Sequence, residues 1–387
     1  MKKVTSALLV LLMLVSVVPL GAGAADGAQI KNVIFMIGDG MGTNHLEWAK
    51  AETGEKLAMD EMPVKGFRVT DSLTGLTDSA AGGTALACGL LAFNSNVGTM
   101  SVSLDGHAFV VLNYVNLCEA SQKAGKKTGV VTSDSNTGAT PATFSAHAAR
   151  RSYAETISAQ QLECGLDLLW TRADGIITES TAVKAGWTYI DSLGELRDLP
   201  ENSKSLAQFT GKMEYDDGDE NGAPLSELTS LAIDQLDDDE DGFFLMVEGA
   251  HIDKYSHSNE KDGMVKSLIE FDKAVANAVD FAEKDGNTMV IVTADHETGG
   301  IVYDPDAKEW KFTVGDHTPA DVPLRVYGDS GMLKDGETIK NVAVARYVAK
   351  ATGLEGIPSF SLNRNVLIDF FKALGDLIAD KAGGLFN

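Results

Sequence analysis

Four short, largely apolar segments constrain the fold of this 387-residue chain more than any other feature. They cover residues 32–37, 127–132, 243–247 and 289–293. Continuous apolar runs of this length, bounded by turn residues, are typical of strands buried on both faces of a sheet. Helical patterns lie between them, as in residues 264–282. This alternation predicts an α/β fold, a three-layer sandwich with a central, mostly parallel β-sheet covered by helices on both faces.

Reactive side chains stand where these predicted strands end. Asp39 follows the first strand, Glu248 closes the third, and Asp295 and His296 follow the fourth. Parallel strands bring their carboxyl ends to one edge of the sheet, and ligands of open α/β sheets bind beyond that edge. We therefore expect these side chains to share a single site.

The mixture of acids and histidines indicates divalent metal ions. Asp253 and His257 are four residues apart, so they share one face of a helix, and such a pair suits Zn²⁺. Asp295 and His296 can reach one ion if the chain turns there. Glu248 suits an all-oxygen site such as that of Mg²⁺. Two ions about 3.5–4 Å apart can clamp the attacking and leaving oxygens of a phosphoryl transfer.

Residues 76–89, LTDSAAGGTALACG, place one acid and one hydroxyl before a run of small residues. Asp78 and Ser79 are typical of a helix N-cap, and the free N–H groups of a first helical turn also favour phosphate. Further along, Arg150 and Arg151 are adjacent. Arginine pairs usually lie at the surface, but a guanidinium beside a metal site is also well shaped to clamp phosphate.

The charge of the chain excludes some partners. The formal net charge is −24, which argues against a nucleic-acid partner or an anionic membrane surface. An anionic substrate would need cations in the site, and bound metal ions would supply them. Of the three cysteines, Cys88 is predicted to be a small buried residue, and a Cys118–Cys164 disulfide stays an open alternative.

Three stretches in this order, TDSAAGGTA (77–85), VEGAHIDK (247–254) and VTADHETGG (292–300), resemble the alkaline phosphatase family. The match runs from about Lys31 to Leu354. The resemblance implies a central, largely parallel sheet between helices. It also implies metal-dependent hydrolysis of phosphate monoesters through a phosphoserine, usually in a homodimer with two Zn²⁺ and one Mg²⁺ per chain.

The resemblance also implies roles for individual residues. Ser79 resembles the nucleophile that becomes phosphorylated, and Arg151 resembles the phosphate clamp. Lys254 falls where some members place a lysine that reaches phosphate through water. From the residues themselves we also expect Asp78 to hold Arg151 by a charge-assisted hydrogen bond. The implied metal ligands are Asp253, His257 and His317 for the zinc that receives the leaving oxygen, Asp39, Asp295, His296 and Ser79 for the zinc that activates the nucleophile, and Asp39, Thr140 and Glu248 for the third metal.

Two features depart from the larger members of the family. Gly138 stands two residues before Thr140, where members often carry Asp or His, so the identity of the third metal stays open. The segment between His296 and His317 is short, which leaves little room for the surface domain that larger members insert there.

There are four rival functions. The weakest, an exported structural protein, explains none of the clustering of histidines and aspartates. A related phosphodiesterase would use a similar ligand set. A sulfatase is disfavoured because Ser79 is followed by Ala-Ala-Gly rather than by the family's proline and arginine. A non-catalytic metal- or phosphate-binding protein would need no nucleophile at all.

The two ends of the chain differ from the region between them. Two lysines, an apolar stretch at 7–18 and a small-residue cleavage site predict a secretory signal peptide over residues 1–24. The mature protein would then be exported, with no further membrane span. Residues 25–354 form the expected catalytic domain. Residues 355–387 form an extension with an amphipathic helix, which could pack on its own domain, bury a dimer surface or lie on a membrane.

Overall fold

The computed structural model describes residues 30–104, 107–328, 331 and 334–359. The predicted signal peptide and the amphipathic stretch beyond residue 364 lie outside these described residues. Within them, the longest helices are too short or too polar to cross a lipid bilayer.

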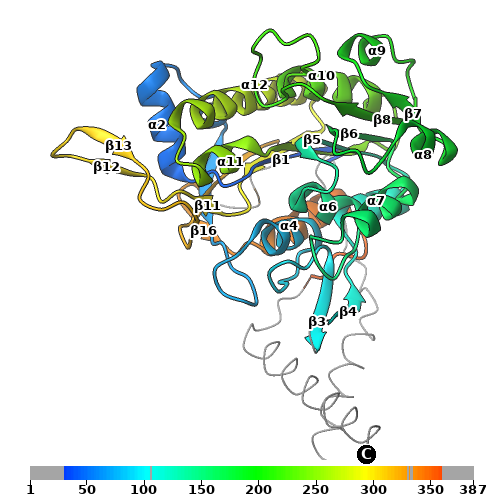
Figure 1. Ribbon diagram of the computed structural model, residues 1–387, viewed down its shortest axis with the longest axis horizontal. Coiled ribbons are helices and arrows are strands. Elements are labelled where there is room, and N and C mark those ends of the chain that lie inside the picture. Colours follow the sequence, from blue (N-terminus) through cyan, green and yellow to red (C-terminus); the bar gives the residue numbers. More distant parts are fainter. Residues whose placement is uncertain (1–29, 105–106, 329–330, 332–333, 360–387) are drawn as a thin grey trace, which may run out of the picture.

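A ten-stranded sheet forms the middle layer of the fold (Figure 1). Across the sheet its strands are β16 (Thr338–Ile339), β2 (Val64–Arg68), β15 (Val322–Tyr327), β10 (Thr288–Thr293), β1 (Asn32–Gly38), β9 (Phe243–Gly249), β5 (Lys127–Ser135), β6 (Leu168–Arg172), β8 (Ser205–Phe209) and β7 (Thr188–Ile190). All neighbours from β10 to β7 are parallel, whereas β15 runs antiparallel to β10 and β2. The four predicted strands are β10, β1, β9 and β5, which lie side by side at the centre.

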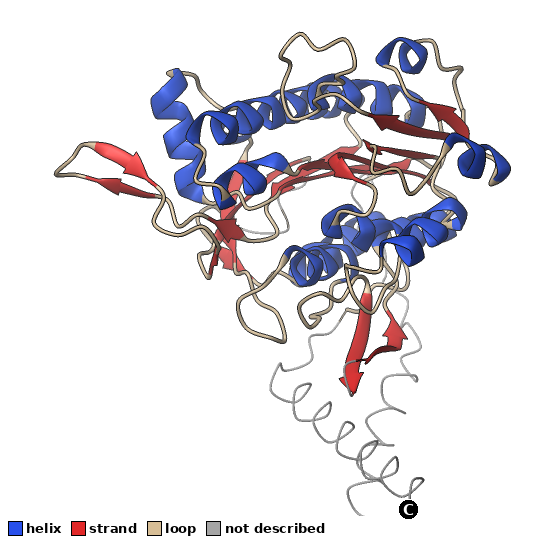
Figure 2. Ribbon diagram, viewed as in Figure 1, coloured by secondary structure: helices blue, strands red, loops and turns tan. Residues whose placement is uncertain are grey.

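Helices cover both faces of this sheet (Figure 2), as the sequence predicted. One face carries α2 (Thr43–Thr53), α3 (Ala58–Glu61), α9 (Leu193–Arg197), α10 (Leu225–Leu236), α11 (His251–His257) and α12 (Lys261–Asp285), and the other carries α4 (Ser79–Cys88), α5 (Leu117–Lys123), α6 (Ala139–Ser145), α7 (Ala154–Glu163), α8 (Glu179–Lys184) and α13 (Ala343–Thr352). The three-layer α/β sandwich is therefore confirmed.

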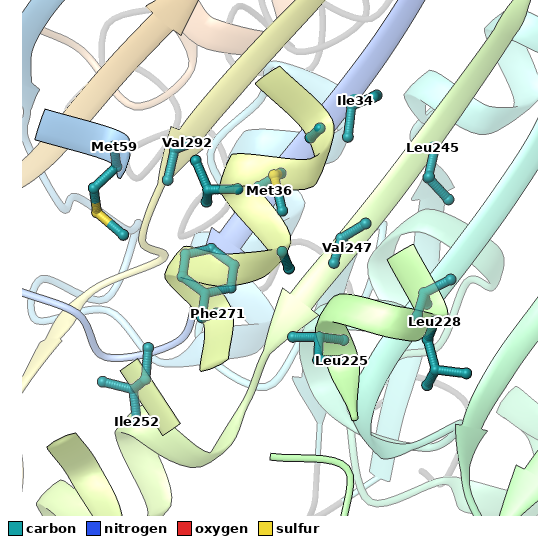
Figure 3. Packing of buried hydrophobic residues seen from close by; sticks show 14 of the residues in the cluster. Ile34, Met36, Met59, Leu225, Leu228, Leu245, Val247, Ile252, Phe271 and Val292 are labelled. Atoms are coloured by element: carbon teal, nitrogen blue, oxygen red, sulfur yellow. The ribbon is translucent and has the colours of Figure 1, made fainter. Parts of the chain in front are cut away.

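The central strand β1 shows how the two layers of helices are held. Its side chains alternate between faces, so Ile34 and Met36 enter one core while Phe35 and Ile37 enter the other. In the first core, Met36 packs among residues of β9, β10, α10 and α12, including Phe271 (Figure 3). Burial on both faces explains why this strand is continuously apolar.

The four central strands end level with one another. Ile37 of β1 pairs with Thr293 of β10 on one side and with Glu248 of β9 on the other, and Glu248 pairs with Thr132 of β5. The loops that follow these strands therefore emerge together at one edge of the sheet.

Three small antiparallel sheets lie outside the central one. They pair β3 (Thr99–Leu104) with β4 (His107–Asn113), β11 (Glu297–Thr298) with β14 (His317–Thr318), and β12 (Val302–Asp304) with β13 (Glu309–Lys311). Within the short segment between His296 and His317, β12 and β13 form a hairpin, which projects from the body of the protein at the left of Figure 1.

The three cysteines are free, so the alternative of a Cys118–Cys164 disulfide is not realised. Cys88 and Cys118 are buried, as predicted for Cys88, and Cys164 is half-buried. Burial raises the pKa of the Cys88 and Cys118 thiols well above the usual value, and that of Cys164 to about 11. All three thiols are therefore poor nucleophiles.

Candidate metal and phosphate site

Ser79 opens helix α4 at the carboxyl edge of the sheet. The predicted N-cap is confirmed, because Asp78 Oδ1 accepts a 2.9 Å hydrogen bond from the Ala81 amide. The small residues of this helix allow a close approach to the loop after β10. A Cβ atom on Gly82 would lie 2.9 Å from the carbonyl oxygen of Asp295. Ser79 itself is only 4% exposed, so its hydroxyl is held inside the site.

Asp39, Asp295 and His296 form a buried group that we call the inner cluster. Their ligand atoms lie within 4.8 Å of one another. Strand β1 delivers Asp39, and the loop after β10 delivers the other two. Asp295 Oδ1 is fixed by the amides of Gly40 at 3.2 Å and of His296 at 2.9 Å. The strand ends therefore set the geometry of this cluster.

Hydrogen bonds decide which nitrogen of His296 carries a proton. The Thr298 hydroxyl donates to Asp253 Oδ1, so it can only accept from His296 Nδ1, which lies 3.2 Å away. His296 Nε2 then carries no proton and presents its lone pair. It therefore donates no hydrogen bond to the nearby carboxylate oxygens, Asp295 Oδ2 at 3.2 Å and Asp39 Oδ1 at 3.5 Å. Burial lowers the pKa of His296, which favours this neutral form. One nitrogen and two carboxylate oxygens facing one point suit a zinc ion.

The carboxylates of the site repel one another. Burial, followed by the negative charges of Asp295, Asp253 and Glu248, raises the pKa of Asp39 well above its ordinary value. Burial and then Asp134 raise the pKa of Glu248 to about 8. Asp39 Oδ1 and Asp295 Oδ2 make no hydrogen bond within the described chain. Divalent cations would satisfy these oxygens and cancel the repulsion.

Asp253, His257 and His317 form a second group, the outer cluster, whose ligand atoms also lie within 4.8 Å of one another. Asp253 and His257 share one face of α11, as their spacing predicted, and His317 comes from β14. His257 directs its Nδ1 to the carbonyl oxygen of Gly315 at 3.0 Å, and His317 directs its Nδ1 to that of Thr77 at 2.8 Å. Their Nε2 lone pairs face each other at 3.2 Å, an arrangement that fits a metal ion between them.

The inner and outer clusters adjoin. Thr298 pairs with His317 in the β11–β14 ladder, which brings the rings of His317 and His296 into a stack with centroids 3.6 Å apart. Thr298 also bonds Asp253 of the outer cluster and His296 of the inner one. Thr298 was not predicted from the sequence, although it lies within VTADHETGG.

Ser79 lies at the inner cluster. Its Oγ is 3.1 Å from His296 Nε2. The hydroxyl therefore stands at the first turn of α4 and beside the proposed metal ligands at the same time, which is where an anionic ligand would meet both.

Arg151 lies beside the N-cap of α4, but its predicted hydrogen bond with Asp78 is wrong. Arg151 Nη1 is 3.7 Å from Asp78 Oδ2, which makes an ion pair too long for a hydrogen bond. Asp78 Oδ2 accepts from the Ser95 amide at 2.9 Å instead. The Arg151 side chain is 42% exposed, so its guanidinium can turn toward an anion at the start of α4.

Two of the residues predicted for the third metal, Glu248 and Thr140, lie at the end of β9 and in the first turn of α6. Glu248 is 1% exposed and accepts a hydrogen bond from Thr132. Thr140 is fully buried, and its hydroxyl has no hydrogen-bond partner in the described chain. Lys254 donates to Asp134, at the end of β5. Asp134 was not predicted from the sequence, although it lies at the end of a buried strand, as Asp39 does.

Arg68 is a further residue that the sequence did not reveal. It is fully buried beneath the site and donates to Thr293 Oγ1 at 3.1 Å and to the Ala294 carbonyl. Burial lowers its pKa to about 10, so it stays charged. These two hydrogen bonds hold the end of β10 in place, and Asp295 follows directly after it.

Comparison with known sequences identifies relatives of the chain. Residues 30–168 and 162–352 match the family described as alkaline phosphatase. Alkaline phosphatase 4 of Bacillus subtilis is 32% identical over 311 residues, which cover 74% of this chain and 65% of that protein. Alkaline phosphatase 3 of the same organism is 34% identical over 306 residues, covering 72% of this chain and 63% of that protein. The chain thus matches somewhat less than two thirds of the length of these relatives.

Solved structures share the fold. The alkaline phosphatase of the Antarctic bacterium TAB5 superposes with a TM-score of 0.73 at 28% identity, covering 85% of this chain and 99% of that one. A variant of the TAB5 protein with magnesium bound in its M3 site gives the same values.

Proposed function

The chain belongs to the alkaline phosphatase family, and from that premise we propose that it hydrolyses phosphate monoesters to an alcohol and inorganic phosphate. The observation that carries the proposal is the Ser79 hydroxyl, 3.1 Å from His296 Nε2 at the first residue of α4. A helix N-terminus favours phosphate, and the adjoining clusters offer the ligand types that divalent metals need.

We propose that the metal-binding residues divide into three sets. The inner cluster together with Ser79 would hold one Zn²⁺, the outer cluster a second Zn²⁺, and the third set one Mg²⁺, as in the M3 site of the TAB5 variant. The third set is Asp39, Thr140 and Glu248. When bound, these ions would lower the pKa of an attacking hydroxyl and neutralise negative charge on the phosphate.

Ser79 is the proposed nucleophile. Its Oγ forms a bond to phosphorus while the bond from phosphorus to the ester oxygen breaks, which gives phosphoserine and the alcohol. Water then displaces phosphate from Ser79 and restores the hydroxyl. Arg151 would donate two parallel hydrogen bonds to the phosphate oxygens. The outer cluster is the more exposed of the two, so the alcohol would leave and water would enter on its side.

The test is a hydrolysis assay on the purified protein, with metal analysis of the same sample. A phosphate monoester and the matching diester are compared under identical conditions. We expect the monoester to react faster, and brief incubation followed by acid quenching should leave phosphate on Ser79, detectable by peptide mass spectrometry. Faster hydrolysis of the diester would favour a phosphodiesterase, and tight phosphate binding without turnover would favour a binding protein.

We further propose that the protein is exported and acts as a homodimer. N-terminal sequencing of the exported protein should begin after Ala24, and light scattering should give twice the chain mass. An uncleaved N-terminus or a monomer would contradict the respective proposal.

A further inference from the structure

Gly138 stands where the resemblance implies an Asp or a His in many members of the family, and its backbone does not require glycine. Its φ of −49° and ψ of 141° are open to any residue. The space around it is the constraint. A Cβ atom at 138 would lie 2.7 Å from Oδ2 and 2.9 Å from Cγ of Asp134. The Asp134 carboxylate thus occupies the place that a side chain at 138 would take.

Hydrogen bonds with Lys254 and Thr132 hold Asp134 in this place. Its Oδ1 accepts from Lys254 Nζ, and its amide donates to Thr132 Oγ1 at 2.8 Å. The Thr132 hydroxyl donates in turn to Glu248 Oε2. Asp134 is therefore joined to Glu248 through one residue, while its Oδ2 stays turned toward Gly138.

Two buried side chains with oxygen atoms, Glu248 and Thr140, belong to the same part of the site. Glu248 is 1% exposed and is linked to Asp134 through the hydroxyl of Thr132. Thr140, in the first turn of α6 and two residues after Gly138, has a buried hydroxyl without a hydrogen-bond partner in the described chain. Carboxylate and hydroxyl oxygens together suit Mg²⁺.

We propose that Asp134 supplies, from the end of β5, the carboxylate that the third metal site lacks at Gly138. Asp134 then joins Asp39, Glu248 and Thr140 as an oxygen ligand of the magnesium site, and the same carboxylate holds Lys254 beside it. This inference rests on the proposed function and deepens it, since it names a residue outside the family pattern.

Magnesium titration of the zinc-loaded protein in a calorimeter tests the proposal. Asp134→Ala should raise the Kd for Mg²⁺ about tenfold or more, the usual effect of losing a group that ligates or orients ligands. Asp134→Asn keeps the shape of the side chain and should cause a loss in the same direction. Asp174→Ala is the matched control, because the partners of Asp174 are Thr137 and the Ile176 amide. It should bind Mg²⁺ like the wild type.

A carboxylate swap sharpens the test. In the Asp134→Ala background the space beside residue 138 is open, so Gly138→Asp should restore most of the affinity for Mg²⁺. Gly138→Asp alone should weaken binding because it crowds Asp134. Wild-type Kd values, within twofold, in both Asp134→Ala and Asp134→Asn would overturn the proposal. A wild type that binds Mg²⁺ but hydrolyses no monoester would instead count against the proposed function.

Discussion

The inner cluster is buried and follows two strands of the central sheet, whereas the outer cluster opens to solvent at the rim. Asp39, Asp295 and His296 all lie below the surface. In the outer cluster the side chain of His257 is 37% exposed and His317 is half-buried. The two clusters therefore contain the same ligand types in different surroundings.

This difference shows two ways of building a metal site. The inner residues are placed by strands whose register is fixed by the core, so their positions are set by the fold itself. The outer residues come from the seven-residue helix α11 and the two-residue strand β14. Because these elements are short and the side chains of His257 and His317 reach solvent, the outer site should exchange its ion and ligands faster.

Of the substitutions considered, Ser79→Ala should lower turnover the most. The substitution removes the proposed nucleophile but leaves both ligand groups of three residues in place. We expect turnover of a phosphate monoester to fall by roughly 10³-fold or more, while the zinc content changes little. Steady-state kinetics and elemental analysis provide the measurement. Turnover near the wild-type level would rule Ser79 out as the nucleophile.

Replacing one histidine of each cluster tests the comparison directly. His296→Ala and His317→Ala should each lower turnover by roughly 10²-fold or more, because each removes a proposed metal ligand. Their effects on folding should differ. Without metal, His296→Ala should lower the free energy of unfolding by about 1–3 kcal/mol, since it leaves a buried gap and strips Thr298 of a donor. His317→Ala should cost less than about 1 kcal/mol. Urea unfolding of the metal-free variants measures this, and equal losses would contradict the distinction.

A chelator should remove the ions of the two clusters at different rates. With EDTA, the outer ion should leave first because its ligands are exposed, and the inner ion should follow more slowly. Activity should be lost in the first phase and return when Zn²⁺ and Mg²⁺ are added. Zinc content and activity measured over the same time course test this prediction. Release of all zinc in a single phase would show that the clusters hold their ions equally.

The smallest expected effect is on stability, and it comes from His147 and Glu119, a histidine–carboxylate pair outside the two metal clusters. His147 Nε2 is 2.8 Å from Glu119 Oε1, and its Nδ1 is 2.9 Å from the Gly98 carbonyl oxygen, so both nitrogens face acceptors. Burial lowers the pKa of His147, but the hydrogen bond and charge of Glu119 outweigh it and raise the pKa overall. His296, in contrast, has a lowered pKa.

The sign of this effect follows from the raised pKa of His147. Its stabilising contribution is complete below the unfolded pKa of about 6.5 and disappears as the pH rises through the folded pKa. We expect the free energy of unfolding to fall by less than about 1 kcal/mol over that window. Urea unfolding of the wild type and of His147→Gln at several pH values measures it. The same pH dependence in both proteins would contradict the assignment.

The sequence predicted the centre of the fold better than its edges. Strands β1, β5, β9 and β10 are buried on both faces, so each leaves a continuous apolar run. The antiparallel strand β15 (Val322–Tyr327) contains Pro323 and Arg325, and β16 has only two residues. Such short or mixed segments leave no distinctive pattern, because their pairing depends on neighbours that are distant in sequence.

The same limit applies to the site. Strand ends and helical spacing bring Asp39, Asp295 and Asp253 to one edge, and these features are local in the sequence. Thr298 and Arg68 act only through residues brought close by folding, such as Asp253 and the carbonyl of Ala294. Their contribution could not be predicted without the tertiary structure, and neither could the 3.7 Å separation of Arg151 and Asp78.

The close approach of helix α4 has a consequence for how the protein tolerates substitution. A single methyl group on Gly82 would meet the Asp295 carbonyl oxygen at 2.9 Å, and one on Gly83 would meet Thr143 Oγ1 at 2.8 Å. In a survey of all single substitutions, these two positions should therefore be as sensitive as Ser79, the proposed nucleophile, although neither carries a functional group. At the glycines of α4, sensitivity to substitution would reflect how closely the helix packs against its neighbours. At Ser79 it would instead reflect the proposed chemistry.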